Sequence, residues 1–115
     1  MAREPLAMVA SAAELDALIA APAPLLVTFT GPKCIICRQL APMLATVVRE
    51  AGAVLASAKV DAEALSEVSE RFEIRSLPTT LLFRDGQLAD RLTGFATAGK
   101  LRDWLASHGV ATGQA

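Results

Sequence analysis

The chain has 115 residues, of which 53% are hydrophobic and 4% aromatic, and its 11 basic and 12 acidic side chains give a formal net charge of -1. This length suits one domain with its own apolar core, and the composition excludes a disordered chain. The near-neutral charge excludes a strong field for nucleic acid or an anionic membrane, so we expect neither as a partner. We expect one domain over residues 1–115, with a compact core at about 6–110.

The first half of the chain predicts two strands and two helices in alternation. These are a short strand at Leu6 to Val9, a helix at Ala12 to Ala20, a buried strand at Leu25 to Phe29 and a helix from Cys34 to about Ala51. Ser11 and Glu14 form a capping box for the first helix. Pro42 predicts a kink in the second helix. The run from Leu6 to Ala13 is a poor secretory signal, and no segment reaches the ~20 apolar residues that span a bilayer.

The second half predicts a strand, a helix, a hairpin and a final helix. These are a strand at Val54 to Val60 after Gly52, a helix at Ala64 to Phe72, strands at Thr79 to Phe83 and Gln87 to Thr93 joined by Asp85-Gly86, and a helix at Ala98 to Ser107. Strands and helices alternate until the hairpin. The order therefore predicts an α/β fold, in which a parallel core is extended by an antiparallel hairpin and covered by helices on both faces.

Both cysteines lie in the sequence Cys34-Ile35-Ile36-Cys37, directly after a Gly31-Pro32 turn. At a helix start, this spacing brings the two backbones within the about 4.4 to 6.8 Å that a disulfide requires. The free amides of the helix favour a thiolate at Cys34, the predicted nucleophile, while Cys37 is the deeper, resolving thiol. Two inert buried residues would be the structural alternative, but the strand-turn-helix context favours redox chemistry.

A metal site formed by one chain is not expected. Tetrahedral zinc needs about four ligands, and the remaining strong nitrogen ligand is His108, far along the chain at a predicted helix end. We therefore predict that a single chain binds no metal.

The chain resembles the thioredoxin family from Leu6 to Val110. The matching segments are Cys34-Ile35-Ile36-Cys37, Pro42, Lys59-Val60-Asp61, Leu77-Pro78-Thr79 and Gly94. The resemblance implies a thioredoxin fold, with a central mixed five-stranded sheet between two layers of helices. It also implies that Pro78 is cis and faces the cysteines, that the backbone of Leu77 pairs with an extended substrate segment, and that Gly94 flanks the active site.

Three positions depart from the family pattern. Ile35-Ile36 replaces the usual Gly-Pro between the cysteines, so we expect a potential different from the roughly -270 mV of thioredoxin. Thr28 stands where the family usually has a buried aspartate that moves the proton of the deeper cysteine. A hydroxyl cannot hold that charge, so Lys59 and a water would have to relay the proton.

The third departure concerns the surface beside the cysteines. Thr30 and Lys33 replace the two tryptophans of the family's active site, which makes this surface less aromatic. Lys33 would favour the Cys34 thiolate and an acidic partner, or else serve only solubility.

The leading function is thiol-disulfide exchange on protein substrates, with Cys34 attacking and Cys37 resolving. Lys33, Leu77, Pro78 and Gly94 are the predicted substrate-binding residues, and Thr28, Ile35, Ile36 and Lys59 tune the reaction. No cofactor is required. We expect a monomer in the reducing cytoplasm, with electrons supplied by a partner reductase.

Two rival functions remain open. A binding or assembly module with weak turnover is favoured by Thr28 and the missing tryptophans. A metal or cluster site shared by the cysteine pairs of two chains is the other, and the colour and metal content of purified protein decide it.

Overall fold

The structure of the chain, a computed structural model, describes residues 4–112, so both ends of the predicted domain lie outside the described residues. Its elements are β1 (Ala7–Met8), α1 (Ala12–Ala20), β2 (Leu25–Thr30), α2 (Ile35–Ala51), the 3-10 turn η1 (Gly52–Val54), β3 (Ala56–Asp61), α3 (Ser66–Arg71), β4 (Thr79–Arg84), β5 (Gln87–Thr93) and α4 (Ala98–Ser107). The predicted order of strands and helices is confirmed. Among these helices, none combines the length and apolar character needed to cross a bilayer.

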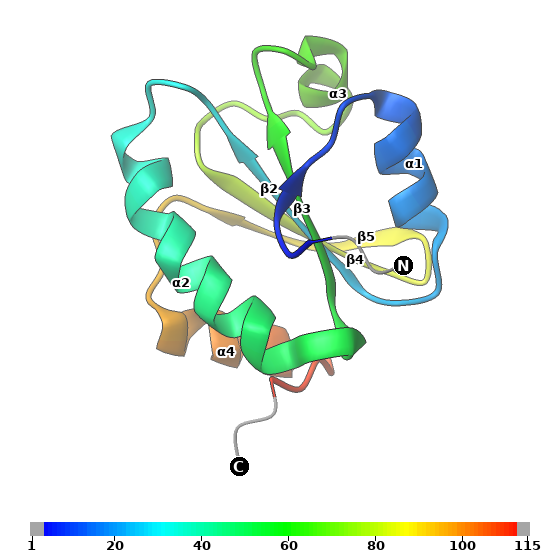
Figure 1. The fold of residues 1–115 in the computed structure, drawn as a ribbon, viewed down its shortest axis with the longest axis vertical. Helices are drawn as coiled ribbons and strands as arrows, with labels where there is room; N and C mark the ends of the chain where they lie inside the picture. The colour runs from blue at the N-terminus through cyan, green and yellow to red at the C-terminus, as the bar shows by residue number, and fades with distance from the viewer. Residues whose placement is uncertain (1–3, 113–115) are drawn as a thin grey trace.

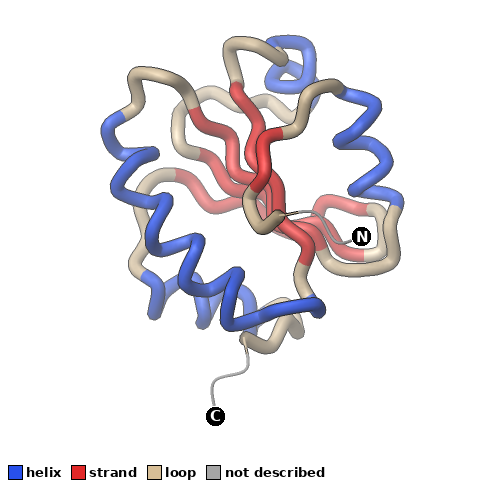
Figure 2. Tube along the Cα trace, viewed as in Figure 1, coloured by secondary structure: helices blue, strands red, loops and turns tan. Residues whose placement is uncertain are grey.

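The five strands form one mixed sheet in the order β1-β3-β2-β4-β5. β3 runs parallel to both β1 and β2, whereas β4 is antiparallel to β2 and to β5. The parallel core and the antiparallel hairpin are therefore as predicted. Figures 1 and 2 show the sheet passing through the centre of the molecule, with helices on both of its faces.

Each face of the sheet carries its own apolar cluster. Leu15 of α1 and Val68 of α3 pack with Phe29 of β2 on one face. On the other face, Leu44 of α2 and Leu101 of α4 belong to a second cluster. Helices α1 and α3 thus cover one face and α2 and α4 the other (Figure 1).

Three boundaries differ from the prediction near β1 and β3. Leu6 has a φ of 57°, so extended backbone begins only at Ala7 and β1 has two residues. Gly52 to Val54 continue the chain as a 3-10 turn, which delays β3 to Ala56. The carboxylate of Asp61 accepts hydrogen bonds from the amides of Glu63 and Ala64, which stabilise a turn and delay α3 to Ser66.

Candidate active site

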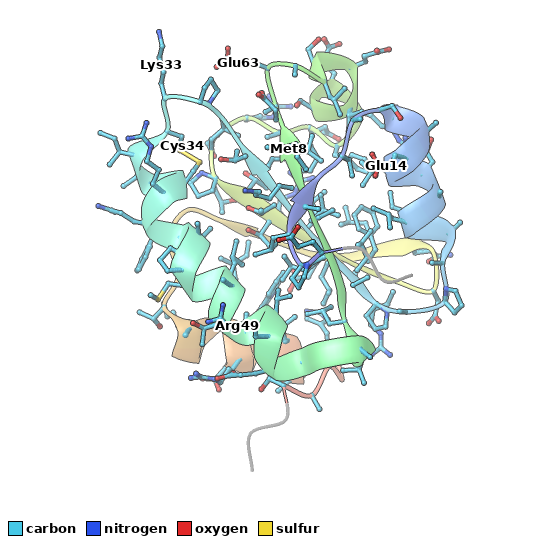
Figure 3. All side chains as sticks on the ribbon, viewed as in Figure 1. Met8, Glu14, Lys33, Cys34, Arg49 and Glu63 are labelled. Atoms are coloured by element: carbon cyan, nitrogen blue, oxygen red, sulfur yellow. A yellow bond between two sulfur atoms is a disulfide. The ribbon has the colours of Figure 1, made fainter. Side chains whose placement is uncertain are left out.

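The two cysteines lie at the start of α2, at the end of a short turn that follows β2. They form a disulfide with a Cα–Cα distance of 5.2 Å, within the range of about 4.4 to 6.8 Å that disulfides span. Cys34 is half-buried, whereas Cys37 is only 8% exposed, as expected for the deeper thiol. Figure 3 shows the disulfide at this end of α2, with Lys33 projecting outward beside it and Glu63 on the neighbouring loop.

Cys34 is the N-cap of α2 rather than its first residue, a small correction to the predicted helix. Its Sγ accepts a hydrogen bond from the backbone N–H of Cys37 at 3.1 Å. The first turn of α2 holds no acidic side chain that would oppose negative charge there. The local electrostatics therefore favour a thiolate on Cys34 once the disulfide is reduced.

The loop before β4 lies against the turn that carries the cysteines. The Leu77–Pro78 peptide bond is cis, as predicted, and Pro78 is buried. A methyl group added to Gly31 would lie 3.0 Å from the Leu77 side chain, so Leu77 packs closely against the turn. Gly94, with a φ of 85°, donates its N–H to the carbonyl of Pro78 at 2.8 Å. The structure thus brings Leu77, Pro78 and Gly94 to the cysteine end of the sheet.

Exposed apolar side chains surround this end of the molecule. Ile35 is 65% exposed and Ile36 42%, and both point away from the core at the start of α2. Phe95, which is 48% exposed, directly follows Gly94. Phe95 was not among the predicted site residues, although its position next to the predicted site residue Gly94 indicated it. These side chains supply apolar area that a docking partner can cover.

Behind the cysteines, Thr28 and Lys59 line one cavity together with Cys37. Thr28 and Lys59 are register partners on β2 and β3. Thr28 is buried, and its hydroxyl accepts a hydrogen bond from Thr80 at 3.3 Å. Thr30 and Arg38 also line the cavity, a role that the sequence analysis did not assign to either.

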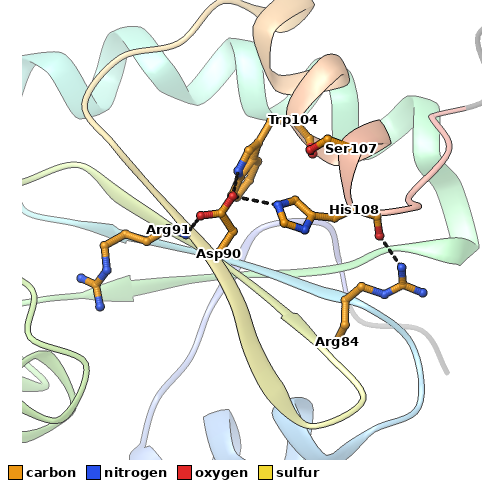
Figure 4. A network of polar contacts seen from close by, with 6 residues as sticks. All are labelled: Arg84, Asp90, Arg91, Trp104, Ser107 and His108. Carbon is orange, nitrogen blue, oxygen red and sulfur yellow. Dashed lines mark hydrogen bonds and ion pairs between the residues drawn. The ribbon is translucent and has the colours of Figure 1, made fainter.

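His108 lies at the end of α4 and belongs to a different cluster. Its Nε2 is 2.7 Å from Oδ2 of Asp90, and the same oxygen accepts a hydrogen bond from the indole of Trp104 (Figure 4). The carbonyl of His108 accepts from Arg84. Within residues 4–112, no three His, Cys, Asp or Glu side chains are grouped as metal ligands would be.

A closed Cys-x-x-C disulfide at a helix start, beside a cis-proline loop and on a five-stranded mixed sheet, defines a thiol-disulfide oxidoreductase. The family model for thioredoxin matches residues 7–107. A thioredoxin of Mycoplasmoides gallisepticum is 34% identical over 93 residues, covering 81% of this chain and 92% of that protein. The chain belongs to the thioredoxin family.

Solved structures agree with this assignment. The thioredoxin of Plasmodium falciparum superposes with a TM-score of 0.81 at 28% identity, covering 90% of this chain and 99% of that one. The thioredoxin of Malassezia sympodialis gives a TM-score of 0.80 at 23% identity, covering 94% of each chain, and shows the same fold. The predicted thioredoxin fold and thiol-disulfide oxidoreductase function are confirmed.

Proposed function

We propose that the chain works in the reducing direction and transfers two electrons to protein disulfides. The Cys34 thiolate attacks a substrate disulfide and releases one substrate sulfur as a thiolate. Cys37 then attacks Cys34 in the mixed disulfide and releases the second. The observation that carries this proposal is the Cys34–Cys37 pair at disulfide distance beside the cis-proline loop, which lets Cys37 reach Cys34 and release the substrate.

The docking groove of this proposal is formed by Leu77, Pro78 and Gly94. Among the described residues, the backbone N–H and carbonyl of Leu77 form no hydrogen bond. They can therefore pair with an extended substrate segment as an added strand. The exposed Ile35 and Phe95 favour an apolar residue near the substrate disulfide, and Lys33 favours an acidic one.

The remaining tuning residues affect the reduction potential of the Cys34–Cys37 pair and the transfer of the Cys37 proton. Ile35 and Ile36 replace the usual Gly-Pro, so we expect a Cys34–Cys37 potential different from the roughly -270 mV of thioredoxin. Thr28 and Lys59 take the place of an acidic relay behind Cys37. Equilibration of the purified protein in glutathione buffers measures this potential, and a value well above that of the cytosolic pool would contradict a reductant.

Electrons for this cycle would come from a partner reductase, and we propose that the protein acts as a monomeric domain in the cytoplasm without a cofactor. The two cysteines are the only ones in the chain, which suits a compartment where structural disulfides are rare.

Reduction of insulin with a chemical reductant tests the function. We expect wild-type protein to accelerate the reaction, Cys34→Ser to abolish the acceleration, and Cys37→Ser to trap substrate on Cys34. Equal activity of wild type and Cys34→Ser would contradict the proposal.

A binding module is the second candidate, because Thr28 places a hydroxyl rather than a carboxylate beside Cys37. Complementation of a deletion strain separates the two functions. A variant with both cysteines replaced by serine remains functional only if the protein is a pure adaptor.

A further inference from the structure

The buried side of Cys37 faces a cavity of about 540 Å³ between α2 and the sheet, here called the α2 cavity. Its size lies within the roughly 300–1,000 Å³ typical of small-molecule sites. The cavity exists because short side chains meet there. Thr28 and Thr30 of β2 face Ala41 and Ala45 of α2 across it, and none of the four is large enough to fill the space.

One cation of the α2 cavity has no partner. Within residues 4–112, the Lys59 ammonium forms no hydrogen bond or ion pair. Every fully buried side-chain nitrogen or oxygen of these residues has a partner, so the Lys59 ammonium touches solvent. The exposed Arg38, whose guanidinium donates a hydrogen bond to the carbonyl of Pro32, adds a second positive charge among the lining residues, and the exposed Glu4 is their one carboxylate. The cavity therefore carries a net positive charge and suits an anion.

The chemistry of Cys37 lacks a proton acceptor. To attack the mixed disulfide, this thiol must lose its proton, and it is only 8% exposed. No carboxylate or imidazole other than the exposed Glu4 lines the cavity that it faces. Thr28 accepts a hydrogen bond from Thr80 and has its own hydroxyl proton left to donate. The Thr28 hydroxyl and the Lys59 ammonium thus line the cavity that Cys37 faces, and Glu4 is the one lining side chain that could accept the Cys37 proton.

We propose that the α2 cavity binds a small carboxylate anion, which Lys59 holds beside Cys37 and which accepts the thiol proton in the resolving step. This inference rests on the proposed function. The proton passes from Cys37 to the carboxylate, Cys37 Sγ bonds to Cys34 Sγ, and the bond from Cys34 to the substrate sulfur breaks. The substrate leaves as a thiolate with the bonding electrons, and the carboxylic acid returns its proton to solvent. Lys59 is a positioning residue in this step.

The test mixes the reduced protein with one equivalent of 2,2′-dithiodipyridine in a stopped-flow instrument, so that no second reagent molecule is left to react with Cys37. Attack by Cys34 releases one equivalent of coloured thiopyridone, and resolution by Cys37 releases a second. Sodium formate or acetate replaces sodium chloride at constant ionic strength and neutral pH. We expect the rate of the second phase to rise about tenfold and to saturate as the carboxylate concentration increases. This gain is smaller than the roughly 10²–10⁴-fold that a general base fixed in the protein contributes. The first phase should not change.

Variants separate the bound anion from a general effect of buffer. Lys59→Met should abolish the acceleration, while Lys59→Arg should retain a saturable response, because it keeps the charge. Ala45→Leu should reduce the response by filling the cavity. Gln39→Leu, an exposed position on the same helix, is the matched control and should respond as wild type does.

The outcomes distinguish the two proposals. Release of two equivalents with no effect of carboxylate on the second phase overturns the anion site and leaves the proposed function intact. A linear response without saturation, or an equal response in Lys59→Met, also overturns the site. Release of a single equivalent overturns both proposals, because Cys37 then does not resolve.

Discussion

Neighbouring residues of β2 experience two different environments. Leu25, Val27 and Phe29 face α1 and α3, and each is at most 1% exposed within a continuous apolar cluster. On the opposite face, Leu26 belongs to the cluster under α2 and α4, but Thr28 and Thr30 border the α2 cavity. One face of the strand is therefore fully packed, while the other becomes polar and hollow as it approaches the cysteines. The chain is thus packed most tightly on the face of β2 that points away from the α2 cavity and Cys37.

Phe29→Ala should have the largest effect, because it opens the packed face. The Phe29 ring is buried and lies 6.3 Å from the ring of Phe72, which contacts Phe83 in turn. We expect a loss of about 3–5 kcal/mol in the free energy of unfolding, measured by urea denaturation. Thr28→Ala, one residue away, should lose much less. Similar losses of unfolding free energy for Phe29→Ala and Thr28→Ala would show that the two faces of β2 are equally well packed.

Thr28→Asp should raise the rate of the resolving step at neutral pH. A carboxylate at position 28 would supply the missing base, with a gain of up to about 100-fold, the lower end of general-base effects. The second thiopyridone phase measures it, and the response to added formate should disappear. Thr28→Asn is the matched control, with the same shape and no ionisable group. Equal rates for the two variants would rule out a missing base as the limiting factor.

Two alanine-to-leucine changes compare the packing of the faces directly. Ala58 of β3 is fully buried in the packed cluster, so Ala58→Leu should cost about 1–3 kcal/mol through overpacking. Ala45 borders the α2 cavity, so Ala45→Leu should change stability by less than about 0.5 kcal/mol. Thermal and urea unfolding measure both. A large cost for Ala45→Leu would mean that the cavity cannot accept a side chain.

Asp90→Asn should have the smallest effect and concerns the polar attachment of α4. The hydrogen bond with His108, followed by those from the Arg91 backbone N–H and the Trp104 indole, holds the pKa of Asp90 below its ordinary value. A lowered carboxyl pKa stabilises the fold above the unfolded-state pKa, and this contribution disappears as the pH falls through the folded-state pKa. The Asp90 side chain is 40% exposed, so screening keeps the effect below about 1 kcal/mol.

The pH dependence of unfolding provides the measurement for Asp90. Wild type should lose stability below about pH 4 more steeply than Asp90→Asn, which should be slightly less stable at pH 7. Asp85→Asn serves as control, because the Asp85 side chain forms no hydrogen bond within the described part of the chain. If the free energy of unfolding falls equally steeply with decreasing pH in wild type and Asp90→Asn, the Asp90 carboxylate does not stabilise the fold.

Local signals predicted most of the fold. The cap at Ser11, the turn at Asp85-Gly86 and the cysteine spacing depend on a few adjacent residues, and each was located correctly. The predicted boundaries of β1 and β3 were wrong, because contacts between residues distant along the chain decide where these strands begin. Gly52 indicated a break after the second helix but not the 3-10 turn that residues 52–54 form. Leu6 has a positive φ, and its amide donates a hydrogen bond to the distant Ser57.

The residues of the site also fall into those that adjacent sequence predicts and those that only the folded chain brings together. The cysteine pair was visible in one segment, whereas the α2 cavity needs β1, β2, β3 and α2 to come together, so no single stretch of sequence indicates it. Lys59 entered the predicted site only through the family resemblance. Arg38 carried no signal of its own, and Thr30 was noted only as a replacement for an active-site tryptophan, because most residues that complete the cavity are distant along the chain.

The cap of α2 has a consequence for how partners recognise this protein. Cys34 closes the helix with the same sulfur that carries the chemistry, and helix geometry fixes its backbone 5.2 Å from that of Cys37. Making or breaking the bond between them requires no change of fold. Reduction therefore changes this one bond and the negative charge that Cys34 can then carry, both at the start of α2. A partner can therefore distinguish the oxidised from the reduced protein by contacting the start of α2, where both the bond and the charge change.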